Sequence, residues 1–127
     1  METTRSRFEI YKDHEILVTD YTHLSGKAFV EAITRAHAFL LASMKSGIHE
    51  VVDVTGSYAD SAVMDALKKT AAEERQYVSK RAVVGVQGMQ RILLEAVNLF
   101  ANHKTVPLGS MEQAKEWLVK QRSANRT

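Results

Sequence analysis

Residues 49–61 of the chain read HEVVDVTGSYADS. The first half is rich in valine and shows little alternation of polar and apolar side chains, which is typical of a strand covered on both faces in a parallel sheet. The second half is rich in hydroxyl and carboxylate side chains, and Asp60 or Ser61 is suited to cap a following helix. A buried strand that leads through a polar loop into a helix predicts an α/β fold.

The segments on either side continue the alternation of strands and helices. Two β-rich runs are separated by a short polar connection at 12–15, which predicts an antiparallel hairpin. The two runs are 7–11 and 16–20, further strands are expected at 49–54, 82–86 and 105–108, and helices at about 25–45, 60–77, 88–100 and 110–121. The order is therefore β-β-α-β-α-β-α-β-α, with a mostly parallel sheet of about five strands and about four helices.

Single residues mark several boundaries of these elements. Gly47 is expected to be the residue just past the end of the first helix, where glycine is favoured. Pro107 lacks an N–H and therefore predicts that the last strand lies at a sheet edge. Ser110 and Gln113 form a capping-box pattern at the start of the last helix. No linker or repeat interrupts the pattern, so we expect a single domain over 1–127 with its core at about 7–121.

Composition excludes several classes of protein. The chain has 127 residues, 45% of them hydrophobic, which fits one soluble globular domain. It contains no cysteine, which excludes disulfide scaffolds, thiolate zinc sites and thiol nucleophiles. The net charge is +2 with both signs interspersed, so a nucleic-acid partner is not expected. The start is polar and the longest apolar run is 38–42, so we expect a cytoplasmic protein without a membrane span.

The polar loop is the first candidate site, because functional groups of α/β sheets gather at the carboxyl ends of the parallel strands. Free N–H groups at a helix start would favour an anion there. The alternative is that the same side chains only form the turn and cap the helix, and both interpretations can hold together. The candidate recognition residues are Asp53, Thr55, Gly56, Ser57, Asp60 and Ser61.

Other sequence patterns give only weak indications of a functional site. Residues 85–88 contain two glycines but lack the spacing of a nucleotide loop, so we expect close packing instead. No histidine has metal-ligand spacing to another, and no nucleophile elbow is present. We therefore expect no cofactor, no metal and no enzymatic activity. Five basic residues could form a patch that binds phosphate: Lys68, Lys69, Arg75, Lys80 and Arg81. The alternative is a solvated helix face of mixed charge, which the nearby Glu73 and Glu74 favour.

The element order and the polar loop resemble the STAS superfamily of anti-sigma-factor antagonist domains, and more closely its SpoIIAA-like branch of small bacterial proteins. Asp53, Thr55 and Gly56 match the D-x-S-G turn of these antagonists, and Asp60 and Ser61 match the first two residues of their Asp-Ser-Ser-Gly motif. The next two positions depart from the motif, because Ala62 and Val63 stand in place of serine and glycine. The loop between the two motifs is also one residue shorter.

The resemblance implies a non-enzymatic regulatory module that binds a protein partner, such as a kinase or an anti-sigma-type factor. It also implies phosphorylation at Ser61, the position that the partner kinase modifies in the family. A dimer remains open. SpoIIAA-like proteins are also similar in fold to CRAL-TRIO lipid-binding domains, which implies an alternative function, binding of a small apolar ligand. The residues expected to border such a cavity are Phe29, Leu40, Met64, Leu93 and Phe100.

Overall fold

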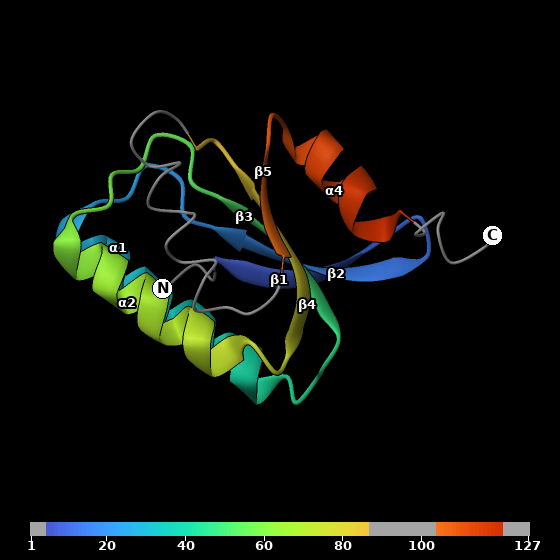
Figure 1. Ribbon diagram of the computed structural model, residues 1–127, viewed down its shortest axis with the longest axis horizontal. Coiled ribbons are helices and arrows are strands. Elements are labelled where there is room, and N and C mark those ends of the chain that lie inside the picture. The colour runs from blue at the N-terminus through green and yellow to red at the C-terminus, as the bar shows by residue number, and fades with distance from the viewer. Residues whose placement is uncertain (1–4, 87–103, 121–127) are drawn as a thin grey trace.

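The computed structural model describes residues 5–86 and 104–120, which form an α/β fold around one five-stranded sheet (Figure 1). The strands lie in the order β1-β2-β3-β4-β5. β1 pairs antiparallel with β2, and the remaining pairs are parallel. The strands are β1 (Ser6–Tyr11), β2 (His14–Asp20), β3 (Ile48–Asp53), β4 (Val78–Val84) and β5 (Lys104–Leu108). The predicted fold class, the mostly parallel sheet and the central place of β3 are confirmed.

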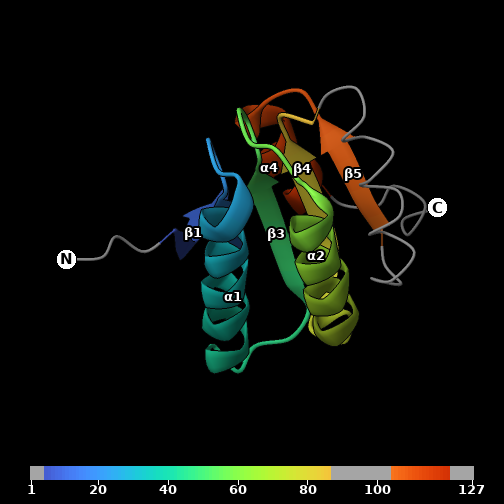
Figure 2. The same ribbon diagram turned by 90° about the vertical axis from the view of Figure 1, so that its left-hand side faces the viewer.

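Helices cover both faces of the sheet. The helices α1 (Gly26–Ala42) and α2 (Ser61–Glu74) lie side by side on one face, and α4 (Met111–Val119) lies on the other (Figure 2). These are three helices within the described residues. The fourth predicted helix, at 88–100, lies outside the described residues. In the part of the chain that the structure describes, no helix is long and apolar enough to cross a membrane.

Alternation along β3 divides the core between the two faces. Val52 packs with Phe29 and Ile33 of α1 and Val63 of α2. Its neighbour Val51 instead belongs to the cluster that α4 completes with Ala114 and Leu118. Successive side chains of a strand point to opposite faces, so the adjacent residues Val51 and Val52 pack into two different hydrophobic clusters. This explains why the predicted strand shows so little alternation.

The hairpin turn is tighter than predicted. Lys12 and Asp13 alone connect β1 to β2, since Tyr11 already pairs with His14. Both turn residues have positive φ, +50° and +68°, as the favoured two-residue hairpin turn requires. His14 and Glu15 were expected in the connection and instead begin β2.

The end of α1 corrects a second expectation. The helix ends at Ala42, and the hydroxyl of Ser43 donates to the carbonyl of Leu40 at 2.6 Å. Met44 then takes the left-handed conformation (φ +56°) expected for Gly47. Gly47 also has positive φ, +65°, but it lies at the entry to β3. Met44 is well exposed, so no packing of its side chain opposes this conformation.

Two boundaries around β4 also differ. α2 ends at Glu74 rather than near 77, and β4 begins at Val78 rather than 82. The early start follows from pairing with β3, because Ile48 already lies opposite Val78. At the other end of the sheet β5 is an edge strand, which confirms the expectation from Pro107. The capping contact of α4 is also confirmed, since the N–H of Gln113 donates to the Ser110 hydroxyl at 3.1 Å.

Candidate functional site

The loop that joins β3 to α2, residues 54–60, is held by hydrogen bonds among its own residues. The Asp53 carboxylate accepts from the backbone N–H of Thr55 at 3.0 Å and from its hydroxyl at 2.6 Å. The Ser57 hydroxyl donates to the carbonyl of Val54 at 2.6 Å. These are the turn contacts expected of these side chains. They fix the direction in which the β3–α2 loop leaves the sheet.

Two glycines let neighbouring segments close on the β3–α2 loop. Gly56 has φ +74°, and a Cβ there would lie 2.6 Å from Cε1 of His23. Gly85, just past β4, has φ +91°, and a Cβ there would lie 2.7 Å from Cα of Thr55. Backbone bonds from His23 to Thr55 and from Tyr58 to Leu24, both 2.9 Å, complete the packing. Gly85 therefore serves close packing, as expected for residues 85–88.

The start of α2 presents polar groups at the same edge of the sheet. Asp60 is the N-cap, and its carboxylate accepts from the N–H of Val63 at 2.9 Å. Ser61 is the first helical residue and is exposed. Tyr58, in the loop before it, is 65% exposed. All six candidate recognition residues therefore lie at one edge, and Asp60 has the capping role considered for it.

A buried cluster of charged side chains, which the sequence analysis did not predict, lies between the sheet and helices α1 and α2. Arg81 of β4 donates from Nε to Glu50 of β3 and from Nη2 to Glu74 of α2, both at 2.7 Å. The residues are 8%, 5% and 7% exposed, respectively. The second carboxylate oxygen of Glu50 accepts from the hydroxyl of Thr19 in β2 at 2.6 Å. The second oxygen of Glu74 lies 2.6 Å from Nδ1 of His37 in α1. We call Glu50, Glu74, Arg81, His37 and Thr19 the buried charge cluster.

This cluster corrects the expected roles of Arg81 and Glu74. Arg81 was considered part of a basic patch with Lys80, but successive residues of a strand face opposite sides of the sheet. Lys80 lies on the α4 side, where its amino group is 4.9 Å from the Trp117 ring centre. Glu74 was expected on a solvated helix face and is instead buried. One signal was present in the sequence, because a charged residue inside a buried strand, as Glu50 is, requires a partner.

Burial and charge both act on the pKa values of Glu74 and Arg81. Burial raises the pKa of the Glu74 carboxyl, against the opposing effects of Arg81 and His37. Burial acts to lower the pKa of Arg81, but Glu50 and Glu74 outweigh it and raise that pKa, so the guanidinium stays charged. Both ring nitrogens of His37 face carboxylates, Nδ1 towards Glu74 and Nε2 towards Glu73 at 2.9 Å.

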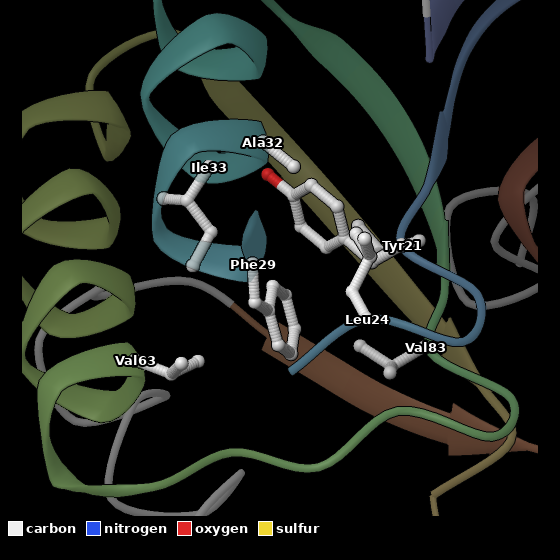
Figure 3. Close-up of a cluster of buried hydrophobic side chains, with 8 residues drawn as sticks. Tyr21, Leu24, Phe29, Ala32, Ile33, Val63 and Val83 are labelled. Carbon is white, nitrogen blue, oxygen red and sulfur yellow. The ribbon is translucent and has the colours of Figure 1, made fainter. Parts of the chain in front are cut away.

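A cavity of about 100 Å³ lies beside this cluster, between the sheet and α2. Most of its wall is apolar, and the polar groups on it include Tyr21, Glu50, Glu74 and Arg81. Figure 3 shows Tyr21, Phe29 and Val83 of this wall between α1 and the sheet. The apolar side chains on the wall include Phe29, Val52, Val54, Met64, Leu67 and Val83.

The structure places some of the side chains predicted for an apolar cavity and not others. Phe29 and Met64 line the cavity, as predicted. Leu40 does not, because it packs into a separate cluster with Leu17, Ile48 and Val78. Leu93 and Phe100 lie outside the described residues. Among residues 5–86 and 104–120, no three histidine, aspartate or glutamate side chains form a group that could hold a metal ion.

Comparison with known proteins bears on the fold. No model of a known protein family matches the chain, and no curated protein matches it. A solved structure from Shewanella loihica PV-4, described as a DUF3478 family protein with a SpoIIAA-like fold, superposes with a TM-score of 0.67. The match covers 89% of this chain and 91% of that one, at 15% sequence identity. This chain has a SpoIIAA-like fold. The resemblance noted in the sequence is thereby confirmed at the level of the SpoIIAA-like fold.

Proposed function

We propose that the chain is a non-enzymatic regulatory module that binds a protein partner through the β3–α2 loop and the first turn of α2. One observation supports this most: the loop is fixed by its own hydrogen bonds yet exposes Tyr58 and Ser61. A preorganised loop loses little conformational entropy on binding. Exposed tyrosines are also among the side chains that contribute most to protein interfaces.

The proposal includes a switch at Ser61. A phosphate there would add about −1.5 to −2 charges at a helix N-terminus, which tolerates negative charge. The fold would therefore survive the modification. A partner surface placed against Asp60 and a phosphoserine would instead meet concentrated negative charge, which disfavours docking. The resemblance to anti-sigma-factor antagonists supports a kinase and an anti-sigma-type factor as the partner classes.

Capture from the native host tests the proposal. Ser61→Ala is expected to retain a stoichiometric partner, whereas Ser61→Asp and Tyr58→Ala are expected to lose it. Ser79→Asp is the matched control, because Ser79 is an exposed serine at the other end of the sheet, near the start of β4. Equal capture by all four variants would overturn the proposed surface. Intact mass of the native protein, with a phosphate mapped to Ser61, tests the switch separately.

The cavity favours a second candidate function, binding of a small apolar ligand. Ligand sites are mostly apolar concavities with a few placed polar groups, and this cavity has that composition. A volume of about 100 Å³ fits a small molecule or one end of a longer chain. The test compares native with denaturing mass spectra of protein from the host. An adduct present only under native conditions supports this function, and a bare mass in both spectra opposes it.

A further inference from the structure

The Tyr21 hydroxyl is an unused hydrogen-bond donor at the cavity. Tyr21 is 6% exposed and lines the cavity, and its hydroxyl makes no hydrogen bond to any residue that the structure describes. Burial, together with Glu50 and Glu74, raises the pKa of this phenol well above its ordinary value. The hydroxyl therefore keeps its proton at neutral pH. A ligand acceptor in the cavity would give this donor a partner.

Arg81 offers donors of the same kind. Its Nε and Nη2 are used on Glu50 and Glu74, whereas Nη1 has no hydrogen-bond partner among the described residues. The guanidinium carries five N–H groups, so the two glutamates leave several of them available. Arg81 lines the same cavity as Tyr21, and its charge acts on the Tyr21 hydroxyl.

Each carboxylate oxygen of the cluster, by contrast, already has one hydrogen-bond partner. One oxygen of Glu50 accepts a hydrogen bond from Arg81, and the other accepts one from Thr19. One oxygen of Glu74 is likewise hydrogen-bonded to Arg81, and the other to His37. The cavity wall therefore has N–H and O–H groups without a partner among the described residues, whereas every carboxylate oxygen of the cluster already has one. This imbalance favours a ligand group that accepts hydrogen bonds over one that only donates them.

The net charge of the cluster decides what kind of acceptor fits. Two carboxylates face one guanidinium, so Glu50, Glu74 and Arg81 sum to −1 when both glutamates are ionised. In that state these three residues leave no positive charge to compensate an anion. A carboxylate or phosphate entering this buried site would lose its hydration without gaining a counter-charge. A neutral oxygen acceptor avoids that cost.

We propose that the cavity binds a small, neutral, mainly apolar molecule through one oxygen acceptor, a carbonyl or an ether, held by Tyr21 and Arg81. The inference rests on the second candidate function above and specifies the ligand class of that site. The apolar wall binds the hydrocarbon part of the ligand, and the two donors fix its orientation. An engineered apolar cavity of about 150 Å³ accepts benzene, and the cavity here is of the same order of size, so small ring compounds are suitable probes.

Four matched probes test the inference by NMR titration of the ¹⁵N-labelled protein. They share one ring and differ only at one substituent: cyclopentanone, methylenecyclopentane, cyclopentanecarboxylate and cyclopentylammonium. Cyclopentanone is expected to bind about tenfold more tightly than methylenecyclopentane, which has the same shape and no acceptor. Both charged probes are expected to bind more weakly than the ketone. Tighter binding of the carboxylate or of the ammonium would overturn the inference.

A variant assigns the selectivity to Tyr21. Tyr21→Phe is expected to weaken cyclopentanone binding about fivefold and to leave methylenecyclopentane within about twofold. Tyr77→Phe is the matched control, since Tyr77 packs in the separate cluster around Leu40 and does not line the cavity. If ketone and hydrocarbon bind equally in the wild type, the inference fails and the apolar cavity function stands. If no probe binds, that function fails as well.

Discussion

Glu50 and Arg81 lie directly opposite each other on the neighbouring parallel strands β3 and β4, and a 2.7 Å hydrogen bond joins their side chains. Both residues are more than nine-tenths buried. Their bond places a charged pair in the middle of the face that α1 and α2 cover, where the surrounding residues are otherwise mainly apolar. Because buried charge must be compensated, we expect substitutions in the buried charge cluster to change the stability of the fold and its dependence on pH.

Replacing Arg81 is expected to destabilise the fold strongly. Arg81→Met leaves Glu50 and Glu74 buried without a counter-charge, and loss of one partner from a buried pair costs about 3–5 kcal/mol. Urea unfolding measures the change in free energy. Arg75→Met, at the exposed end of α2, is the control and should stay within about 0.5 kcal/mol. A cost for Arg81→Met as small as the control's would contradict the role of the cluster.

Stability is expected to respond to pH through Glu74. Its folded pKa is raised above the ordinary 4.5, so the folded state binds the proton more tightly than the unfolded state. The stability from this group is complete below pH 4.5 and declines as pH rises through the folded pKa. Glu74→Gln stays neutral, so this variant should gain stability relative to the wild type over that window. Urea unfolding at a series of pH values measures the difference.

Glu9 gives the control of opposite sign. A hydrogen bond from Lys115 lowers the pKa of Glu9 below 4.5, so its contribution is present above pH 4.5 and is lost as pH falls through the lowered pKa. Glu9→Gln should therefore lose stability relative to the wild type as pH rises. If the two variants respond to pH in the same direction, the assignment of Glu74 is wrong.

Substitution of Gly85 tests whether the β3–α2 loop packs closely against the end of β4. Gly85→Ala would place a Cβ against the Thr55 backbone in a residue with φ +91°, at an expected cost of about 2–3 kcal/mol. Gly26 also has positive φ, +56°, but a Cβ there meets no atom of the described residues within 4 Å. Gly26→Ala should therefore cost only about 1 kcal/mol of backbone strain. Equal costs in urea unfolding would show that the loop does not approach Gly85.

Capping and recognition can be separated at the start of α2. Asp60→Ala removes the acceptor for the Val63 N–H and is expected to cost about 1 kcal/mol of stability. Ser61→Ala removes an exposed hydroxyl and should change stability by less than about 0.5 kcal/mol. Thermal unfolding of both variants checks the pair. A large loss in Ser61→Ala would mean that Ser61 is a structural residue.

The sheet could be predicted because local pattern determines it. The valines of β3 indicated a central strand, Pro107 an edge strand, and Ser110 with Gln113 the start of α4; the structure confirms each. The C-terminal end of α1 was predicted wrongly because Gly47 and Met44 both take positive φ. The hydroxyl of Ser43 bonds the Leu40 carbonyl at the actual end of the helix, a contact that the sequence alone does not show.

The buried charge cluster could not be predicted, for a different reason. Glu50 and Arg81 are 31 positions apart, and their pairing depends on the register of two parallel strands. Helical periodicity assigned Glu74 to the solvent face, whereas the last turn of α2 lies over the sheet and buries it. The candidate recognition residues lie at one edge of the sheet because they are nearly contiguous in sequence, and their role stays a prediction. The cavity was predicted only in part, because five elements contribute to its wall.

Hydrogen exchange with and without the captured partner tests the proposed recognition surface most directly. Our account predicts added protection of backbone amides in the β3–α2 loop and the first turn of α2, over residues 54–64. It also predicts that Ser61→Asp removes this protection while leaving exchange in the central strand β3 unchanged. Protection confined to α4 or to the β1 edge, with 54–64 unaffected, would contradict the claim that this loop is the binding surface.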